Sequence, residues 1–307
     1  METLYITHPS CHLHEMGRWH PESPERLDAI NDQLLSSGLA SYLLGRKARL
    51  ATDQDILRVH DAAYLQQLKQ QLPKQGYFNI DADTLMNPHT LEAAYAAAGA
   101  GLDAVDGVMQ EGAAGAFCSV RPPGHHAESN RAMGFCFFNN VAVAAAYAME
   151  RYGLSRVLIV DFDVHHGNGT EQIFAGDERV LMCSFFQHPF FPGSYQVPVP
   201  KNMVNIPVQA YAKSTQVLEA FKQQCMPRIK AFRPEIVFFS AGFDAHREDE
   251  MGQLSLVEAD YAELTTAVVK ACAPSAGQRL VSMLEGGYDA SSLGRSVVAH
   301  VRAMAGL

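Results

Sequence analysis

Short and almost continuously apolar runs alternate with longer helical segments through most of this chain. Apolar runs without a polar face are typical of parallel strands that helices cover on both faces. We expect strands at residues 4–6, 116–120, 157–162, 180–185, 236–240 and 280–284. Helices are expected near residues 24–37, 61–72, 88–112, 139–152, 215–232, 256–272 and 291–304. The pattern predicts an α/β fold with a central, mostly parallel sheet flanked by helices.

No linker, low-complexity tract or internal repeat divides the chain, so we expect one domain over residues 1–307. The net charge is −9 and no cluster of Lys and Arg is present, which argues against nucleic acid as a partner. No apolar run reaches the ~20 residues of a membrane span, and the N-terminus lacks the pattern of a secretion signal. Six scattered cysteines are typical of reduced thiols, and we expect a cytoplasmic protein.

Polar residues follow four of the expected strands at their carboxyl ends. These polar segments are residues 121–126, 161–168, 240–244 and 285–288, and a polar loop with four histidines covers residues 8–20. Ligands of parallel sheets bind just beyond the carboxyl ends of the strands. Burying this many charges costs several kcal/mol per ion unless a metal ion or partner charges compensate. The sequence therefore predicts a binding site at this edge of the sheet.

Asp163, His165 and Asp244 are the candidate metal ligands. Asp163 and His165 are two residues apart at a strand end, a spacing from which both side chains can reach one ion. Three ligands leave one position free for water or substrate, as in catalytic metal sites. One imidazole with two carboxylates suits Zn²⁺ and also admits Fe²⁺ or Co²⁺. The alternative is that the two aspartates only cap helices.

His125 and His126 follow Pro-Pro-Gly, an irregular backbone from which adjacent side chains can point into one pocket. Each imidazole needs a partner for its second ring nitrogen, and Asp161 and Asn168 are the nearest candidates. Beside a metal ion such a pair can act as acid and base, whereas alone it is more often structural. Tyr288, flanked by glycines in Glu-Gly-Gly-Tyr, can donate to a developing oxyanion or simply be a half-buried tyrosine.

These segments resemble the zinc-dependent histone deacetylase family, and in particular its class II-like bacterial branch. The resemblance covers nearly the whole chain. The motifs that carry it are His20-Pro-Glu-Ser-Pro-Glu-Arg26, Asp81-Ala-Asp83-Thr84, Arg121–His126, Gly134–Phe138, Asp161–Gly169, Gly242-Phe-Asp244 and Glu285–Tyr288. The resemblance implies the arginase/deacetylase fold, with the active site in loops at the carboxyl ends of the strands.

The resemblance also implies the metal sites. The zinc ligands of the family match Asp163, His165 and Asp244. A structural potassium ion of the family is held by backbone and side-chain oxygens at positions that match Asp161, Asp163, His165, Ser184 and Phe185.

The catalytic residues of the family match five positions. Its tandem histidines match His125 and His126, which pair with Asp161 and with Asn168, where class I members carry aspartate. The transition-state tyrosine matches Tyr288, which is histidine in the vertebrate class IIa members, so we expect a competent enzyme. The implied reaction is hydrolysis of an N-acyl amide, in which zinc polarises the carbonyl and acidifies the attacking water. The second histidine transfers the proton to the leaving amine, and the first acts electrostatically.

The substrate is expected to be an acylated lysine in a protein or peptide, or a small acylated amine. The substrate tunnel of the family matches Gly134, Phe135 and Phe191; the aromatic residues can also be plain loop anchors. Alignment places Met251 at the rim, which favours acyl-lysine, whereas a one-residue slip would place Glu250 there and favour cationic acetylpolyamines. A binuclear ureohydrolase and a non-catalytic acyl-lysine-binding protein are the alternatives outside this activity, and the oligomeric state is not predicted.

Overall fold

The central sheet of the computed structural model, which describes residues 2–193 and 195–307, contains eight strands that all run parallel. Their spatial order is β2-β1-β5-β10-β9-β6-β7-β8. The strands are β1 (Thr3–Thr7), β2 (Leu43–Lys47), β5 (Ala116–Cys118), β6 (Val157–Asp161), β7 (Val180–Gln187), β8 (Met203–Val208), β9 (Ile236–Ala241) and β10 (Leu280–Leu284). A small antiparallel pair, β3 (Phe78–Asn79) and β4 (Leu85–Met86), lies apart from this sheet.

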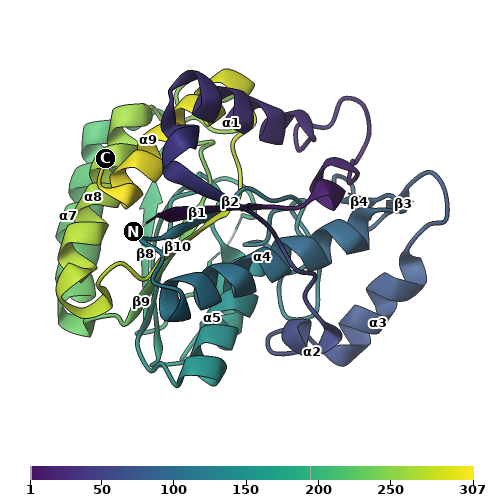
Figure 1. The fold of residues 1–307 in the computed structure, drawn as a ribbon, viewed down its shortest axis with the longest axis horizontal. Helices are drawn as coiled ribbons and strands as arrows, with labels where there is room; N and C mark the ends of the chain where they lie inside the picture. Colours follow the sequence, from purple (N-terminus) through teal and green to yellow (C-terminus); the bar gives the residue numbers. More distant parts are fainter. Residues whose placement is uncertain (1, 194) are drawn as a thin grey trace.

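Every residue of β6, β9 and β10 is buried, which requires helices on both faces of the sheet. On one face α4 packs against α5, and on the other α1, α9, α8 and α7 form a continuous row (Figure 1). The helices are α1 (Glu25–Ser36), α2 (Asp53–Ile56), α3 (Ala62–Gln71), α4 (Thr90–Gln110), α5 (Asn140–Tyr152), α6 (Asn168–Phe174), α7 (Ser214–Phe232), α8 (Glu258–Ala276) and α9 (Ala290–Ala305). The predicted fold class, an α/β fold with a parallel sheet between helices, is confirmed.

Besides short elements such as α2, α6 and the β3-β4 pair, the sequence pattern did not predict the two edge strands of the sheet. β2 is half-exposed and ends in Arg46 and Lys47, and β8 contains Asn205 and the exposed Pro207. Edge strands in natural proteins carry such charged residues and prolines, so they lack the continuous apolar run on which the prediction rested. The helix bounds differ from the expected ones by a few residues, most clearly at α8, which extends to Ala276.

The order of the strands in the sheet brings the four polar segments together. The four polar segments follow β5, β6, β9 and β10, which are far apart in the sequence. In the sheet these strands are consecutive neighbours, in the order β5-β10-β9-β6. Because all four are parallel, their carboxyl ends meet at one edge, and the polar segments meet there too.

Candidate active site

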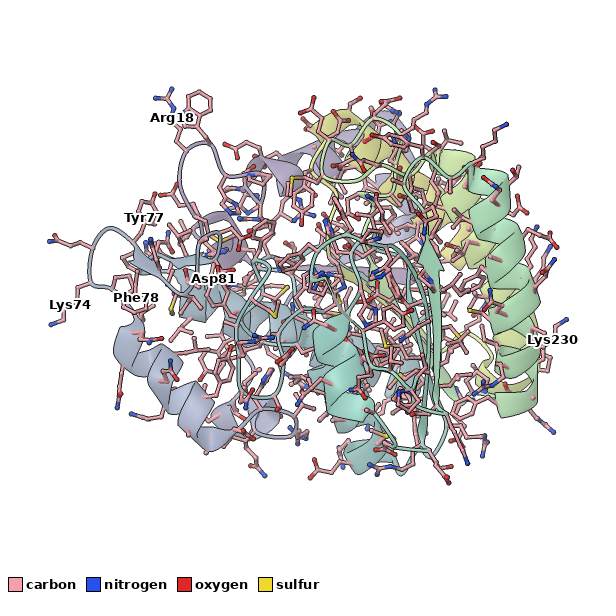
Figure 2. The ribbon with its side chains drawn as sticks, turned by 180° about the vertical axis from the view of Figure 1, so that it is seen from behind. Arg18, Lys74, Tyr77, Phe78, Asp81 and Lys230 are labelled. Atoms are coloured by element: carbon pink, nitrogen blue, oxygen red, sulfur yellow. The ribbon has the colours of Figure 1, made fainter. Side chains whose placement is uncertain are left out.

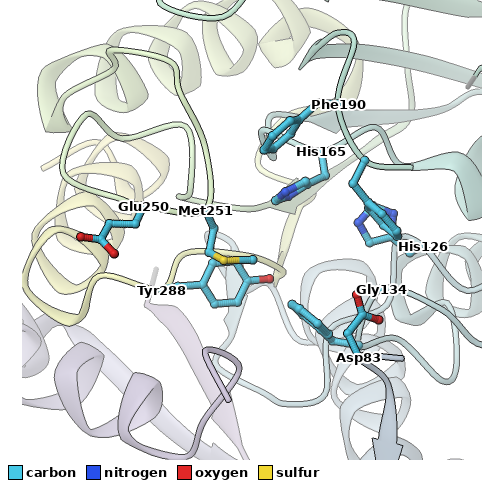
Figure 3. Close-up of a pocket in the computed structure, with 10 residues that line it drawn as sticks. Asp83, His126, Gly134, His165, Phe190, Glu250, Met251 and Tyr288 are labelled. Atoms are coloured by element: carbon cyan, nitrogen blue, oxygen red, sulfur yellow. The ribbon is translucent and has the colours of Figure 1, made fainter. Parts of the chain in front are cut away.

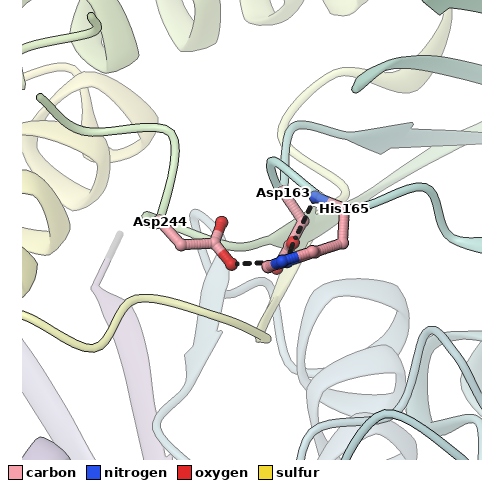
Figure 4. A group of neighbouring side chains, drawn as sticks. All are labelled: Asp163, His165 and Asp244. Atoms are coloured by element: carbon pink, nitrogen blue, oxygen red, sulfur yellow. Dashed lines mark hydrogen bonds and ion pairs between the residues drawn. The ribbon is translucent and has the colours of Figure 1, made fainter. Parts of the chain in front are cut away.

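Asp163, His165 and Asp244 lie together at this edge as a buried group whose ligand atoms are all within 4.8 Å of one another. His165 Nδ1 is 3.1 Å from Asp163 Oδ1 and 3.0 Å from Asp244 Oδ2 (Figure 4). Asp163 and His165 come from the loop after β6, and Asp244 from the loop after β9. The geometry therefore brings the three candidate ligands to a single point.

Two glycines make room for these carboxylates. A Cβ atom at Gly242 would lie 1.9 Å from Asp163 Oδ2, and one at Gly286 would lie 2.2 Å from Asp244 Oδ2. Backbone amides fix the carboxylates: Gly286 N donates to Asp163 Oδ2 at 2.9 Å, and the amide of Val164 donates to Asp244 Oδ1 at 2.9 Å. The glycines of the two motifs are thus required by close packing against the acidic side chains.

The electrostatics of the group fit a divalent cation. Burial, with the neighbouring charge of Asp163, raises the pKa of Asp244 to about 7. Among the described residues no Lys or Arg pairs with either carboxylate, and their ion pairs are with histidines. Buried carboxylates are stable when paired or bound to a metal. The one imidazole and two carboxylates are a donor set that zinc accepts.

The two adjacent histidines of the neighbouring loop have different partners. His125 Nδ1 lies 3.0 Å from Asp161 Oδ2, and His126 Nδ1 lies 2.9 Å from Asn168 Oδ1. The amide group of Asn168 is oriented by Glu128, whose carboxylate accepts from Asn168 Nδ2 at 2.9 Å. The amide oxygen therefore faces His126, so His126 carries its proton on Nδ1 and keeps Nε2 as an acceptor.

The different surroundings of the two imidazoles shift their pKa values in opposite directions. Although burial opposes protonation, the carboxylates of Asp163 and Asp161 raise the pKa of His125 to about 10. Burial, together with the nearby charges of His125 and His165, lowers the pKa of His126 well below its usual value. His125 is accordingly the charged member of the pair and His126 the neutral one.

Glu285 and Glu128 contribute to the site although the sequence reasoning gave them no role. Glu285 Oε2 accepts from the amides of Gly124 and His125 at 2.6 and 3.1 Å, and thereby fixes the loop that carries the histidines. The position of Glu285, an acidic residue directly after the apolar β10, was a signal that could have identified it.

A buried ion cluster, which we call the anchor, ties the N-terminal segment to the site. Glu22 accepts from Arg121 through both carboxylate oxygens and from Arg26 at 3.1 Å, while His14 lies 3.5 Å away. Arg26 in turn donates to the carbonyls of Glu285 and Gly287. The loop at residues 8–20 was expected to be polar, yet His14 is fully buried because the anchor encloses it.

A cavity of about 220 Å³ lies beside His126 and His165 (Figure 3). The residues that line it are Asp83, His126, Gly134, Phe135, His165, Phe190, Phe191, Glu250, Met251 and Tyr288. The rings of Phe135 and Tyr288 meet edge-on with their centroids 6.0 Å apart. Those of Phe191 and His126 meet edge-on with their centroids 5.0 Å apart. The wall residues Gly134, Phe135 and Phe191 thus lie together, and Phe190 of the same aromatic loop joins them.

Tyr288 is held on the opposite side of the cavity from His126 (Figure 3). Its amide donates to Asp249 Oδ2 at 2.6 Å, and the Arg26 guanidinium lies 5.0 Å from the centre of its ring. Burial and the charge of Asp244 raise the pKa of the Tyr288 hydroxyl well above its usual value. The hydroxyl therefore stays protonated and available as a hydrogen-bond donor.

Met251 and Glu250 both border the cavity, with different orientations. The side chain of Met251 points toward Tyr288 and the cavity, whereas the carboxylate of Glu250 points away from the histidines (Figure 3). Met251 is half-buried and Glu250 is exposed.

Ser184 and Phe185 lie in β7, outside the cavity lining. Ser184 pairs in register with Asp161 across β6 and β7. Its hydroxyl is buried and has no hydrogen-bond partner among the described residues.

Comparison with known proteins identifies the family of the chain. The family model for the histone deacetylase domain matches residues 20–304. A histone deacetylase-like amidohydrolase of Pseudomonas aeruginosa is 36% identical over 277 residues, which cover 88% of this chain and 73% of that protein. A protein of Danio rerio named polyamine deacetylase HDAC10 is 36% identical over 321 residues, covering 99% of this chain and 46% of the longer relative.

A solved structure shares the fold as well as the sequence. The crystal structure of the HDA15 HD domain superposes with a TM-score of 0.93 at 33% identity, covering 99% of this chain and 88% of that one. The family match over most of the chain and the shared fold lead to one conclusion. This chain belongs to the histone deacetylase family and is a hydrolase of amide bonds.

Proposed function

We propose that this chain is a zinc-dependent amidohydrolase that removes acetyl or other acyl groups from the Nε atom of lysine in proteins or peptides. The observation that carries the proposal is the convergence of three chemically distinct groups on one cavity. These are the buried ligand group, the neutral imidazole of His126 and the protonated hydroxyl of Tyr288.

Zinc would be held by Asp163, His165 and Asp244, and the same donors also suit Fe²⁺ or Co²⁺. When bound, zinc polarises the acyl carbonyl and makes water more acidic. Among the described residues, no helix has both the length and the apolar character that crossing a bilayer demands.

The residues around the ligands divide the remaining chemistry. His126, with Nδ1 held by Asn168, accepts the proton of the attacking water at Nε2 and passes it to the leaving amine. His125, kept cationic by Asp161 and Asp163, stabilises negative charge that develops in the transition state. The hydroxyl of Tyr288 donates a hydrogen bond to the developing oxyanion.

A structural potassium ion is the second metal of the proposal. The oxygen atoms that would coordinate it belong to Asp161, Asp163, His165, Ser184 and Phe185. The buried Ser184 hydroxyl supports it, because an unpaired buried oxygen is costly unless a ligand satisfies it. The ion would join β6 and β7 behind the zinc ligands, where Asp161 and Ser184 are paired.

Acyl-lysine is the proposed substrate because Met251 presents an apolar side chain toward the cavity. A small acylated amine is the second candidate, and it is favoured by the carboxylates of Asp83 and Glu250 on the cavity lining. These carboxylates would attract the distal ammonium group of an acylated polyamine.

Turnover of two substrates tests both candidates. The purified protein is assayed with an acetyl-lysine peptide and with N-acetylputrescine, each with and without a chelator. We expect higher kcat/KM for the peptide and loss of turnover after chelation. Preference for N-acetylputrescine would establish the second candidate instead. Absence of turnover with both substrates in zinc-loaded protein would contradict the proposed function.

A further inference from the structure

Glu171, in the short helix α6, is a buried carboxylate that joins three segments of the chain. It is 2% exposed, and its oxygens accept hydrogen bonds from side chains and backbone on three sides. His166 Nε2 lies 3.0 Å from Oε2, the amide of Gln196 donates to Oε2 at 3.1 Å, and Asn205 Nδ2 donates to Oε1. We call these four residues the Glu171 clamp.

Each partner belongs to a different part of the active-site surroundings. His166 follows the proposed ligand His165 directly, and Asn205 lies on the edge strand β8. Gln196 belongs to the segment after β7 that also carries Phe190 and Phe191, the aromatic wall of the cavity. The ring of Phe190 stacks on the ring of His165 (Figure 3), with centroids 5.3 Å apart and planes 15° from parallel.

A carboxylate suits this position better than other side chains. It only accepts hydrogen bonds, and its two oxygens can serve all three donors at once. A glutamine of the same shape keeps one neutral acceptor oxygen and replaces the other with an amide group that must donate. His166 Nε2 and the amide of Gln196, which share Oε2, then face either a neutral oxygen or another donor. The clamp therefore depends on the charge of Glu171 as well as on its size.

We propose that Glu171 is a positioning residue that holds the aromatic wall of Phe190 and Phe191 at a fixed distance from His165, and thereby sets which acyl chain the cavity accepts. The specificity part of this inference rests on the proposed deacylase function. The mechanical part, in which Glu171 ties the segment of Gln196 to helix α6, does not depend on it. The two parts call for two measurements.

The first measurement is backbone amide hydrogen exchange in the segment 188–202. Glu171→Gln and Glu171→Ala are compared with Gln172→Ala. This control lies on the same helix, and its exposed side chain bonds to Ser129 alone among the residues that the structure describes. Loss of a hydrogen bond to a charged acceptor should accelerate exchange in this segment by roughly tenfold or more. The control should match the unmodified protein. Equal exchange in Glu171→Gln and Gln172→Ala would overturn the clamp.

The second measurement is the ratio of kcat/KM for acetyl-lysine and butanoyl-lysine peptides. Because small displacements of a positioning wall change rates steeply, we expect Glu171→Gln to shift this ratio by about tenfold. Zinc content, measured by elemental analysis, should stay unchanged. An equal fall for both peptides, with an unshifted ratio, would overturn the positioning role. If the unmodified protein hydrolyses neither peptide, the proposed function fails, whereas the exchange experiment still decides the clamp.

Discussion

Two buried charged clusters lie side by side at the carboxyl edge of the sheet, and they balance their charges differently. In the anchor, the carboxylate of Glu22 is surrounded by the guanidinium groups of Arg26 and Arg121. In the ligand group, Asp163 and Asp244 share only the imidazole of His165, with His125 nearby. The carboxylate of the anchor is compensated within the protein by two guanidinium groups, whereas the two carboxylates of the ligand group share one imidazole.

The pKa directions follow from this difference. Burial raises the pKa of a carboxyl group in both clusters. At Glu22 the charges of Arg121 and Arg26, with the imidazole of His14 close by, outweigh burial and lower the pKa below its usual value. At Asp244 the neighbouring carboxylate of Asp163 adds to burial and the pKa rises to about 7. Buried charge alone therefore does not indicate a metal site, whereas buried carboxylates without Arg or Lys partners are what a metal ion would stabilise.

The largest expected effect is at the uncompensated cluster. Asp244→Ala removes a proposed ligand, so zinc measured by elemental analysis should fall from about one equivalent to near zero. A bound metal contributes several kcal/mol to the transition state, so kcat/KM should fall by about a thousandfold or more. Full zinc content in the folded variant would show that Asp244 belongs, like Glu22, to a structural cluster.

The anchor should respond in stability rather than in metal content. Glu22→Gln leaves Arg121 buried without its full partner, and removing one member of a buried pair costs about 3–5 kcal/mol. Urea unfolding measures this loss. Asp28→Asn is the matched control, because its surface pair with His12 is exposed and contributes about 0–1 kcal/mol. Loss of zinc from folded Glu22→Gln would contradict the distinction between the clusters.

Arg26 of the anchor contacts the ring of Tyr288, so a variant of Tyr288 can show whether turnover is lost while the stability of the anchor is kept. Tyr288→Phe keeps the ring and removes only the hydroxyl donor. We expect kcat to fall by about a hundredfold to a thousandfold, as for the loss of other oxyanion donors. Zinc content and the unfolding midpoint should stay unchanged, and the exposed Tyr211→Phe should have no effect. Near-normal turnover would remove Tyr288 from the mechanism.

The smallest expected effect is the pH dependence of the anchor. The pKa of Glu22 is lower in the folded chain than the 4.5 of the free side chain. The stability that Glu22 contributes is therefore fully present above pH ~4.5 and is lost as the pH falls below that value. The difference in unfolding free energy between the unmodified protein and Glu22→Gln should be constant from pH 6 to 8. Below pH ~4.5 this difference in unfolding free energy should shrink by at most about 1.4 kcal/mol per pH unit. A difference that grows toward low pH would contradict this sign.

Much of the site was predictable because its residues stand in short motifs. The spacing of Asp163 and His165, the adjacent histidines and the strand-end positions all follow from local sequence. The anchor and the Glu171 clamp were not predictable in this way. Glu22 and Arg121 are 99 residues apart, and Glu171 and Asn205 are 34 apart, so no local pattern connects them.

The sequence by itself determined the fold class, because apolar runs without a polar face can be buried only in a sheet covered on both faces. It also determined which residue types end those strands. Only the tertiary structure decided how the charges are shared, because compensation depends on distances between segments from different strands. The orientation of Met251 toward the cavity and of Glu250 away from it was decided in the same way. Adjacent residues on a loop have no fixed relation to a cavity until the surrounding segments pack.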